Sequence, residues 1–232
     1  MLYTLEHVRD NIRNREGRRV FYLGKNDQLT CQARDYLNRE RIEILPAQQA
    51  KPAAYRLLGG GFCQEKPEHM THLNAQVLVN KTHPRILFRG HMDTLEAQLL
   101  LCMHSAPEQL RQDLEQVLAL ARNIIKWDVL EEVPPEQTLC GLTPQQLRER
   151  SHRPQDYYGQ PHFMPSAQDS RVILELNLAR CVARQAELAA VAAFSDRDNN
   201  PTRPELLQML NRMSSMLYIL MIQQKGRGTA GK

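Results

Sequence analysis

Helical spacing of apolar residues dominates the chain from Arg85 onward. Apolar side chains recur every three to four residues, which places them along one face of a helix. The pattern predicts five helices, at Met92–Ser105, Ala106–Glu131, Thr143–Arg150, Ser170–Phe194 and Pro204–Gln224. Helices with one apolar stripe bury it most readily against one another, so the pattern predicts a helical bundle.

A different pattern precedes the bundle. An apolar run at Val20–Leu23 is followed by an amphipathic segment, Thr30–Leu37, and by alternating apolar residues over Ile42–Ile44. This order predicts a strand, a helix and a second strand. We therefore expect a mainly α chain, with a small α/β unit at residues 1–50 ahead of the bundle.

Glycine and proline separate the two parts. The stretch PAQQAKPAAYRLLGGGFCQEKPEHM, which starts at Pro46, holds three prolines and three consecutive glycines. Because these residues interrupt regular structure, we expect a linker at 51–65 and a bundle domain at 66–224. Residues 225–232 have no apolar side chain to bury and are expected to form a disordered tail.

Composition narrows the class of protein. The 232 residues carry a formal net charge of +4, with basic and acidic side chains interspersed, so nucleic acid is not expected as a partner. Five cysteines without a C-x-x-C spacing are typical of reduced thiols. No apolar run reaches the roughly 18 residues of a membrane span. These features favour a cytoplasmic protein with no membrane partner.

Charged residues interrupt the predicted helix Ser170–Phe194. Arg180, Arg184 and Glu187 follow one another at spacings of four and three, which places them on one narrow stripe. A solvated face with an Arg–Glu pair would explain the stripe. However, the rest of this helix is nearly all small or apolar, and charges on an enclosed helix are costly unless they are paired or used.

The last predicted helix repeats this feature, with a polar island at residues 211–215 in an apolar segment. The two helices together could line one pocket. Guanidinium groups match phosphate oxygens bidentately, so such a pocket suits an anion or a nucleotide. The chain has neither a G-x-x-x-x-G-K-[ST] nor a G-x-G-x-x-G motif, so a nucleotide would need another kind of site.

Five motifs, in this order, resemble the cobalamin (corrinoid) adenosyltransferases, and within them the ethanolamine-utilisation branch, which is related to the propanediol-utilisation type. They are KPEHMTHLNAQVLVNKTHPRI (66–86), RGHMDTLEAQL (89–99), GLTPQQLRERSHRPQDYYGQPHFMP (141–165), LNLARCVARQAELAA (176–190) and LNRMSSMLYILMI (210–222). The segment LTCQARDYLNRERIEIL also resembles the leader domain of that branch. The resemblance covers nearly the whole chain and implies the five-helix bundle of this family.

The resemblance implies a reaction as well. The 5'-deoxyadenosyl group of ATP would be transferred to the cobalt of a reduced corrinoid, cob(I)alamin or a relative of it, with release of triphosphate. ATP would carry Mg²⁺, which triphosphate oxygens bind with few protein ligands. The alternatives are a non-enzymatic helical binding or scaffold protein derived from the same bundle, and another ATP-using bundle enzyme.

The resemblance assigns roles to residues of the bundle. Arg184 would contact the phosphates of ATP, and Glu187 would orient Arg184 or the nucleotide. Arg180 would pair with Asp93 in a bridge that shapes the corrinoid site. Asn211 matches the asparagine of the family's L-N-R-x-S motif, which is expected to donate a hydrogen bond to ATP.

Further roles fall on the loops. The segment from Lys66 to Lys81 takes the place of the family's ATP loop, where Thr71, His72 and Lys81 align with positions expected to contact triphosphate and Lys66 is a further candidate. Phe163 stands close to an aromatic position whose packing under the corrinoid displaces the lower axial ligand. Ordinary core packing is the alternative for Phe163.

Metal binding by the protein is not expected. His69 and His72, with Cys63 and His83 nearby, could be read as a site for Zn²⁺ or Fe²⁺. Some members of the ethanolamine branch carry a Cys-Cys-x-x-Cys cluster just before the Lys-Pro motif. Here Cys63 alone remains of it, so we predict no transition-metal site.

The resemblance also suggests partners. A homo-oligomer is expected, either a dimer or a trimer with sites between subunits. A cobalamin reductase and ethanolamine ammonia-lyase are candidate partners, and a bacterial microcompartment is a candidate location within the cytoplasm.

Overall fold

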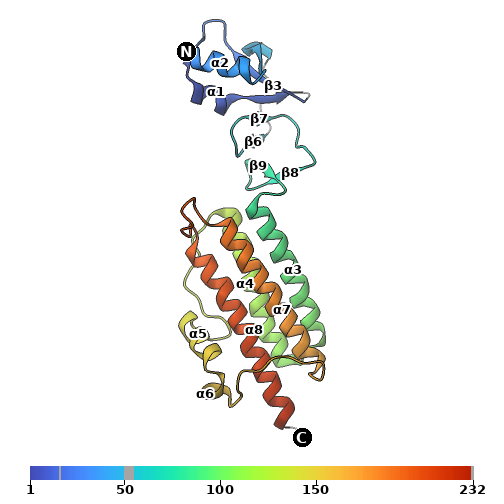
Figure 1. Cartoon of the computed structure of the whole chain (residues 1–232). Helices are drawn as coiled ribbons and strands as arrows, with labels where there is room; N and C mark the ends of the chain where they lie inside the picture. The colour runs from blue at the N-terminus through green and yellow to red at the C-terminus, as the bar shows by residue number, and fades with distance from the viewer. Residues whose placement is uncertain (16, 50–54, 231–232) are drawn as a thin grey trace. The chain divides into compact units, whose positions relative to one another are not determined.

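The structure is a computed structural model that describes residues 1–15, 17–49 and 55–230, with side chains as far as residue 227 (Figure 1). The chain forms two compact units, Met1–His83 and Pro84–Lys232. No helix in the described ranges is both long enough and apolar enough to cross a membrane.

The described residues of the first unit form a seven-stranded sheet in the order β5-β3-β2-β7-β6-β9-β8, and a two-stranded parallel sheet of β1 and β4. The strands are β1 (Leu2–Tyr3), β2 (Arg13–Arg15), β3 (Arg18–Leu23), β4 (Gln28–Leu29), β5 (Glu43–Pro46), β6 (Tyr55–Leu57), β7 (Phe62–Cys63), β8 (Met70–His72) and β9 (Val77–Asn80). The helices are α1 (Leu5–Asn11), α2 (Cys31–Arg39) and the 3-10 turn η1 (Ala47–Gln49).

The predicted strand–helix–strand unit is confirmed. Helix α2 begins after Thr30, whose hydroxyl accepts a hydrogen bond from the backbone N–H of Ala33 at 3.3 Å. It connects β3 to β5, which pair in parallel. Phe21 of β3 and Leu37 of α2 are fully buried in the small core of this unit. The sequence pattern does not predict α1, because charged residues surround its one buried side chain, Val8.

The expected linker contains strands β6 and β7, whereas residues 51–54 lie outside the described residues. The three glycines form the turn between these strands. Gly61 has a φ of +83°, and a Cβ at this position would lie 2.3 Å from the carbonyl oxygen of Ile12. Glycine is therefore required for the chain to turn so close to β2.

The first unit also extends further along the chain than the expected boundary at 51–65. It includes the β8–β9 hairpin, which the sequence assigned to the bundle domain. Strand β9 pairs in parallel with β6, and Leu78 and Val79 are buried. These backbone hydrogen bonds join the segment to the sheet.

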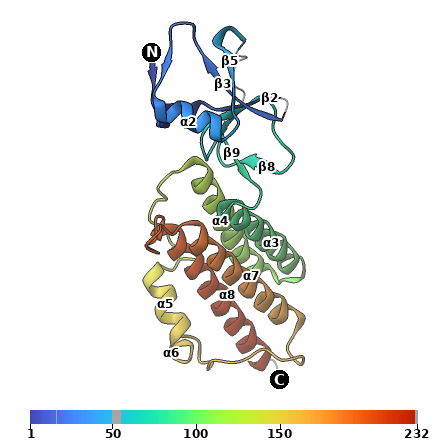
Figure 2. The same cartoon turned by 45° about the horizontal axis from the view of Figure 1, so that its top comes forward.

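The described residues of the second unit form four long helices and two short ones (Figures 1 and 2). They are α3 (Pro84–Ser105), α4 (Glu108–Leu130), α5 (Pro144–His152), α6 (Pro154–Tyr158), α7 (Arg171–Ala193) and α8 (Pro204–Ala230). All five predicted helices are present, and α6 is an addition. Helix α7 packs between α3 and α8, and α5 and α6 pack against α8.

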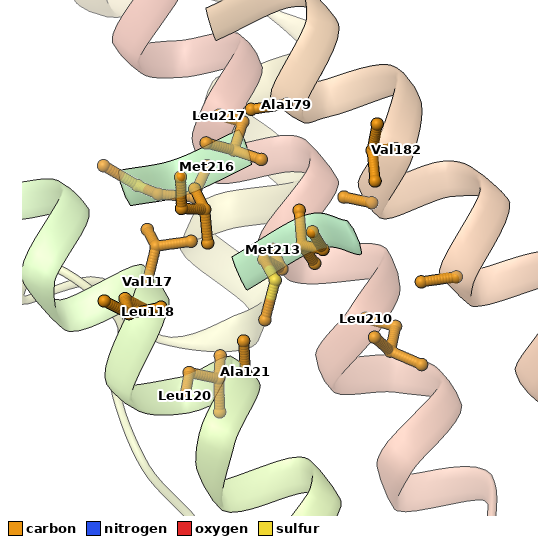
Figure 3. Close-up of a cluster of buried hydrophobic side chains, with 14 of the residues drawn as sticks. Val117, Leu118, Leu120, Ala121, Ala179, Val182, Leu210, Met213, Met216 and Leu217 are labelled. Atoms are coloured by element: carbon orange, nitrogen blue, oxygen red, sulfur yellow. The ribbon is translucent and has the colours of Figure 1, made fainter. Parts of the chain in front are cut away.

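The core of the bundle is apolar. Figure 3 shows side chains of α4, α7 and α8 in this core, among them Val117, Val182 and Met213. One carboxylate is also buried. Asp128, near the end of α4, is fully buried, and its two oxygens accept hydrogen bonds from Arg85 Nε at 2.8 Å and Arg89 Nε at 2.7 Å. These ion pairs join the start of α3 to the end of α4.

The tail expected from residue 225 is helical as far as residue 230, and residues 231–232 lie outside the described residues. Lys225 forms an ion pair with Asp169 in the segment before α7. Gly226 packs against Gln160, and a Cβ at position 226 would lie only 3.2 Å from the Gln160 side chain. Contacts with these residues therefore extend α8 beyond its apolar part.

Burial predicts which thiols react. Cys31 is exposed, whereas Cys102 is buried among apolar side chains of the bundle. Burial, with a smaller effect of the negative charge on Glu175, raises the pKa of the Cys102 thiol to about 12. At pH 8 roughly 1 in 10,000 such thiols is a thiolate, the reactive form.

Alkylation at pH 8 followed by mass spectrometry should therefore modify Cys31 within minutes and leave Cys102 unmodified until the protein is unfolded. Equal labelling of both residues in the native protein would contradict the burial of Cys102.

Candidate functional site

A cavity of about 300 Å³ opens among residues of α5, α7 and α8. Its lining residues are Ser151, His152, His162, Arg180, Arg184, Ser214, Ser215 and Tyr218. The two arginines lie one turn apart on α7, and the hydroxyl groups come mainly from α8. The structure therefore places two guanidinium groups and several hydroxyl groups around one space, as the stripe on α7 and the polar island on α8 suggested.

Arg180 is held by its own helix. Its Nε and one terminal nitrogen donate hydrogen bonds to Asn177 Oδ1 at 3.3 and 3.0 Å. Asp93 is exposed on α3. Among the ion pairs of the described residues there is none between Arg180 and Asp93. The expected bridge is therefore not formed within one copy of the chain.

A chain of polar contacts connects α7 to α8. Asn211 Nδ2 donates a hydrogen bond to Glu187 Oε1 at 2.7 Å, and Arg212 donates one to Asn211 Oδ1. Glu187 thus orients Asn211. The exposed side chain of Arg184 lies on the same stripe of α7.

Arg212 is the least satisfied polar side chain in this region. Its Nε and Nη1 are buried, and they have no hydrogen-bond partner among the described residues. Burial lowers the pKa of Arg212, the nearby Arg148 lowers it further, and Glu187 opposes both effects. A cation kept in such surroundings is costly. Arg212 contacts Asn211 but lines a separate cavity of about 280 Å³, and not the one that Arg180 and Arg184 line.

His162 is another residue that sequence reasoning missed. One ring nitrogen, Nε2, lies 3.1 Å from the carbonyl oxygen of His152, and the other, Nδ1, lies 2.9 Å from the hydroxyl of Tyr218. A carbonyl oxygen can only accept, so Nε2 carries a proton, and in the neutral ring Nδ1 then accepts from Tyr218. The two rings also stack, with centroids 5.7 Å apart. The pair fixes this side of the cavity, and no local motif predicts it.

Phe163 is half-buried and packs against the core of the bundle. Lys225 Nζ lies 5.4 Å from the centroid of its ring. This placement agrees with ordinary core packing, and a contact of Phe163 with a corrinoid stays a prediction.

The candidate residues of the expected ATP loop lie in the first unit, on and beside the β8–β9 hairpin. Thr71 is opposite Val79, and the backbone N–H of Lys81 donates to the carbonyl of His69 at 2.9 Å. Because side chains alternate along strands, Thr71 lies on one face of the hairpin and His72 on the other, and Lys81 follows the end of β9. The ring of His72 lies against Tyr55, with centroids 5.7 Å apart.

Lys66 precedes the hairpin. It lines a cavity of about 630 Å³ together with Arg15, Tyr22 and His69. Among the described residues, no group of three or more His, Cys, Asp or Glu side chains is arranged to hold a metal ion.

Comparison with known proteins places this geometry in a family. Residues 62–224, which include the bundle cavity and the β8–β9 hairpin, match the family model described as cobalamin adenosyltransferase. The chain therefore belongs to the cobalamin adenosyltransferase family.

Curated members of the family are similar to the chain. The corrinoid adenosyltransferase EutT of Salmonella typhimurium is 34% identical over 158 residues, which is 68% of this chain and 59% of the relative. The corrinoid adenosyltransferase EutT of Escherichia coli strain K12 has the same identity and coverage. The chain thus spans about three-fifths of the length of these relatives. Residues 1–61 lie outside the match to the cobalamin adenosyltransferase model.

Proposed function

We propose that this family member transfers the 5'-deoxyadenosyl group of ATP to the cobalt of cob(I)alamin or a related corrinoid, in ethanolamine utilisation. The products would be adenosylcobalamin and triphosphate. The observation that carries the proposal is the cavity that brings Arg180 and Arg184 together with the hydroxyl groups of α8, within the residues that match the family. The similar proteins named corrinoid adenosyltransferase support it further.

In the proposed adenosyl transfer, the cavity would have to position ATP and stabilise the charge on the leaving triphosphate. The electron pair of Co(I) attacks C5' of ATP, the cobalt–carbon bond forms, and the bond from C5' to the phosphate oxygen breaks with its electrons leaving on triphosphate. Negative charge grows on the leaving group in the transition state. Guanidinium groups aimed at that charge lower the barrier, and holding the reactants in line adds to the effect. Arg184 would perform the first task, together with the Mg²⁺ that ATP carries.

Asn211 is prepared to bind a ligand. An asparagine amide has two N–H donors, and one of them is used by Glu187. Arg212 occupies Asn211 Oδ1, which fixes the orientation of the amide. The remaining N–H would donate to ATP.

Asn211→Ala is expected to lower the kcat/KM of adenosylation by roughly 10- to 100-fold, because it removes this donor and leaves Glu187 and Arg212 without their shared partner. The same loss should cost about 1 to 3 kcal/mol of unfolding free energy. Steady-state kinetics and urea denaturation measure the two effects. Unchanged kinetics would remove Asn211 from the site.

A homo-oligomer is part of the proposal. Large apolar side chains are exposed on α3 and α7, which pack side by side. They are Leu87, Leu100, Leu101, Leu174, Leu178, Leu188 and Val191. Large apolar side chains exposed on two neighbouring helices are typical of a protein interface. In an oligomer, the exposed Asp93 of one copy would become available to Arg180 of another.

Replacing both Leu178 and Leu188 by glutamate should dissociate this oligomer, because two charges would have to be buried in its interface. Light scattering is expected to give a multiple of 26.8 kDa for the unaltered protein and 26.8 kDa for the double variant. Leu130→Glu, an exposed position at the end of α4, serves as the control and should leave the mass unchanged. A monomeric unaltered protein would contradict the interface.

The decisive experiment for the activity mixes the protein with ATP, Mg²⁺ and chemically reduced cobalamin, and follows the absorbance change of cobalt–carbon bond formation. Turnover is the expected result. A scaffold protein would give no change, and another ATP-using enzyme would consume ATP without needing the corrinoid.

A cobalamin reductase and ethanolamine ammonia-lyase stay candidate partners, and a microcompartment stays a candidate location.

A further inference from the structure

Another cavity, the α5 cavity, opens beside the bundle cavity. Its volume is about 330 Å³, and it is lined by Gln145, Arg148, Glu149, His152 and Arg153. His152 also lines the bundle cavity, so the two spaces adjoin at this residue. The proposed reaction gives no role to the other four residues.

Helix α5 turns a polar face toward this cavity. Arg148 and His152 are four residues apart and therefore lie on the same side of the helix. Leu147 and Ser151 are buried, and α5 packs along α8 (Figures 1 and 2). Packing against α8 thus fixes which face of α5 lines the cavity.

The arginines of this region have no carboxylate partner. Within the part of the chain that the structure describes, the side chains of Arg148, Arg153 and Arg184 form no hydrogen bond or ion pair. Glu149, the carboxylate that lines the α5 cavity, accepts a hydrogen bond from the hydroxyl of Tyr157 at 2.5 Å. One carboxylate against two guanidinium groups leaves the cavity positive, and both groups are available to an anionic ligand.

Arg212 adds positive charge on the α8 side of α5. Burial lowers the pKa of Arg212, and the positive charge of Arg148 lowers it further, which means that the two guanidinium groups lie close enough to repel each other. Glu187 opposes this effect, but its carboxylate also holds Asn211. Like charges at close range are costly, and an anion bound beside Arg148 would relieve the repulsion.

The proposed substrates are too large for the bundle cavity alone. Its volume is about 300 Å³, whereas ATP and a corrinoid together occupy far more space, so part of one of them must lie beside it. Each carries phosphate. ATP has its triphosphate, and a complete corrinoid such as cobalamin has a phosphodiester in its nucleotide tail. The α5 cavity adjoins the bundle cavity and offers the guanidinium groups that phosphate oxygens bind.

We propose that Arg148 and Arg153 bind a phosphate group of one of these substrates in the α5 cavity. The inference rests on the proposed function for its choice of ligand. The guanidinium fork matches two phosphate oxygens at once, and the volume falls within the roughly 300 to 1,000 Å³ of small-molecule sites. The two arginines serve binding and not the transfer step, so their loss should raise KM and leave kcat nearly unchanged.

Binding to the full chain tests the proposal without the transfer reaction. Calorimetry gives the Kd of ATP with Mg²⁺. Anaerobic equilibrium dialysis with saturating ATP gives the Kd of cob(II)alamin and of cob(II)inamide, which lacks the phosphodiester. Without a reductant the cobalt stays Co(II), and no adenosyl group is transferred. The double change Arg148→Gln and Arg153→Gln should weaken the binding of ATP or of cob(II)alamin by at least about 10-fold, the usual effect of a lost charge-assisted hydrogen bond.

The two measurements identify the source of the phosphate. Weaker binding of ATP assigns the cavity to the triphosphate. Weaker binding of cob(II)alamin, with an unchanged Kd for cob(II)inamide, assigns it to the phosphodiester of the nucleotide tail.

Arg150→Gln is the matched control. Arg150 lies on the same helix, its guanidinium carbon is 5.2 Å from the ring centroid of Tyr157, and it lines neither cavity. Its replacement should change each Kd less than about 2-fold. Circular dichroism checks that the variants fold, as expected for the exposed Arg148 and Arg153. If the double variant does not fold, Arg148→Gln alone replaces it.

Three results would overturn the proposal. The first is an unchanged Kd for both ATP and cob(II)alamin in the double variant. The second is an equal loss with Arg150→Gln, which would indicate attraction to the overall charge of α5. The third is an equal loss for cob(II)alamin and cob(II)inamide with ATP unaffected, since no phosphate would then be involved. A protein that binds both substrates but transfers no adenosyl group would refute the proposed function alone.

Discussion

Arg184→Ala is expected to lower the kcat/KM of adenosylation by about 100- to 1,000-fold, which is the usual effect of removing one preorganised donor from a developing negative charge. Arg184 is exposed on α7 and lines the bundle cavity. Its truncation should therefore change the unfolding free energy by no more than about 0.5 kcal/mol. Steady-state assays with ATP and cob(I)alamin, and thermal unfolding followed by circular dichroism, measure the two quantities.

Gln185→Ala is the matched control for Arg184. Gln185 is the next residue of α7 and is also exposed, but it does not line the cavity. Its replacement should leave both activity and stability within experimental error of the unaltered protein. If the charge acts on the leaving triphosphate, Arg184→Ala should lower kcat as well as raise KM, because the interaction strengthens in the transition state. Full turnover by Arg184→Ala would refute the proposed role of the cavity.

The sequence predicted the elements of the bundle well because each helix carries its own apolar stripe. The stripe on α7 also predicted that Arg180 and Arg184 would face one space, since residues four apart on a helix lie on the same side. Two of the cavity's other groups were not predictable in this way. His162 and Tyr218 are 56 positions apart, and their contact depends on how the segment after α6 packs against α8.

Contacts between segments far apart in the chain were the hardest to predict from the sequence. The glycines near residue 60 indicated a turn, but not that the turn connects two strands of a sheet or packs against Ile12. Residues 66–83 read as part of the bundle domain, whereas β9 pairs with β6. A strand pairs with segments elsewhere in the chain, and a local apolar pattern does not show which segment that is. The prediction of a disordered tail from residue 225 did not anticipate the helix for a related reason. The ion pair between Lys225 and Asp169 joins residues far apart in the chain.

The buried carboxylate of Asp128 is a third long-range feature, and it leads to the largest expected effect on stability. Asp128 is fully buried, whereas the side chains of Arg85 and Arg89 are 16% and 15% exposed. Arg85 also donates to the backbone carbonyl of Asp128 at 2.6 Å. A carboxylate near the C-terminal end of a helix is disfavoured by the helix dipole. The two guanidinium groups offset this cost, and the three side chains together fix the start of α3 against the end of α4.

Asp128→Ala should lower the free energy of unfolding by about 3 to 5 kcal/mol, because it removes the buried carboxylate that two mostly buried guanidinium groups share. Urea denaturation measures the change. Glu131→Gln is the control, since Glu131 pairs with Arg85 at 3.2 Å but its side chain is 58% exposed, and it should cost no more than about 1 kcal/mol. A similar small loss for Asp128→Ala would mean that apolar packing alone holds α3 against α4. A large loss would mean that the position of α3, and with it Asp93, depends on this buried ion pair.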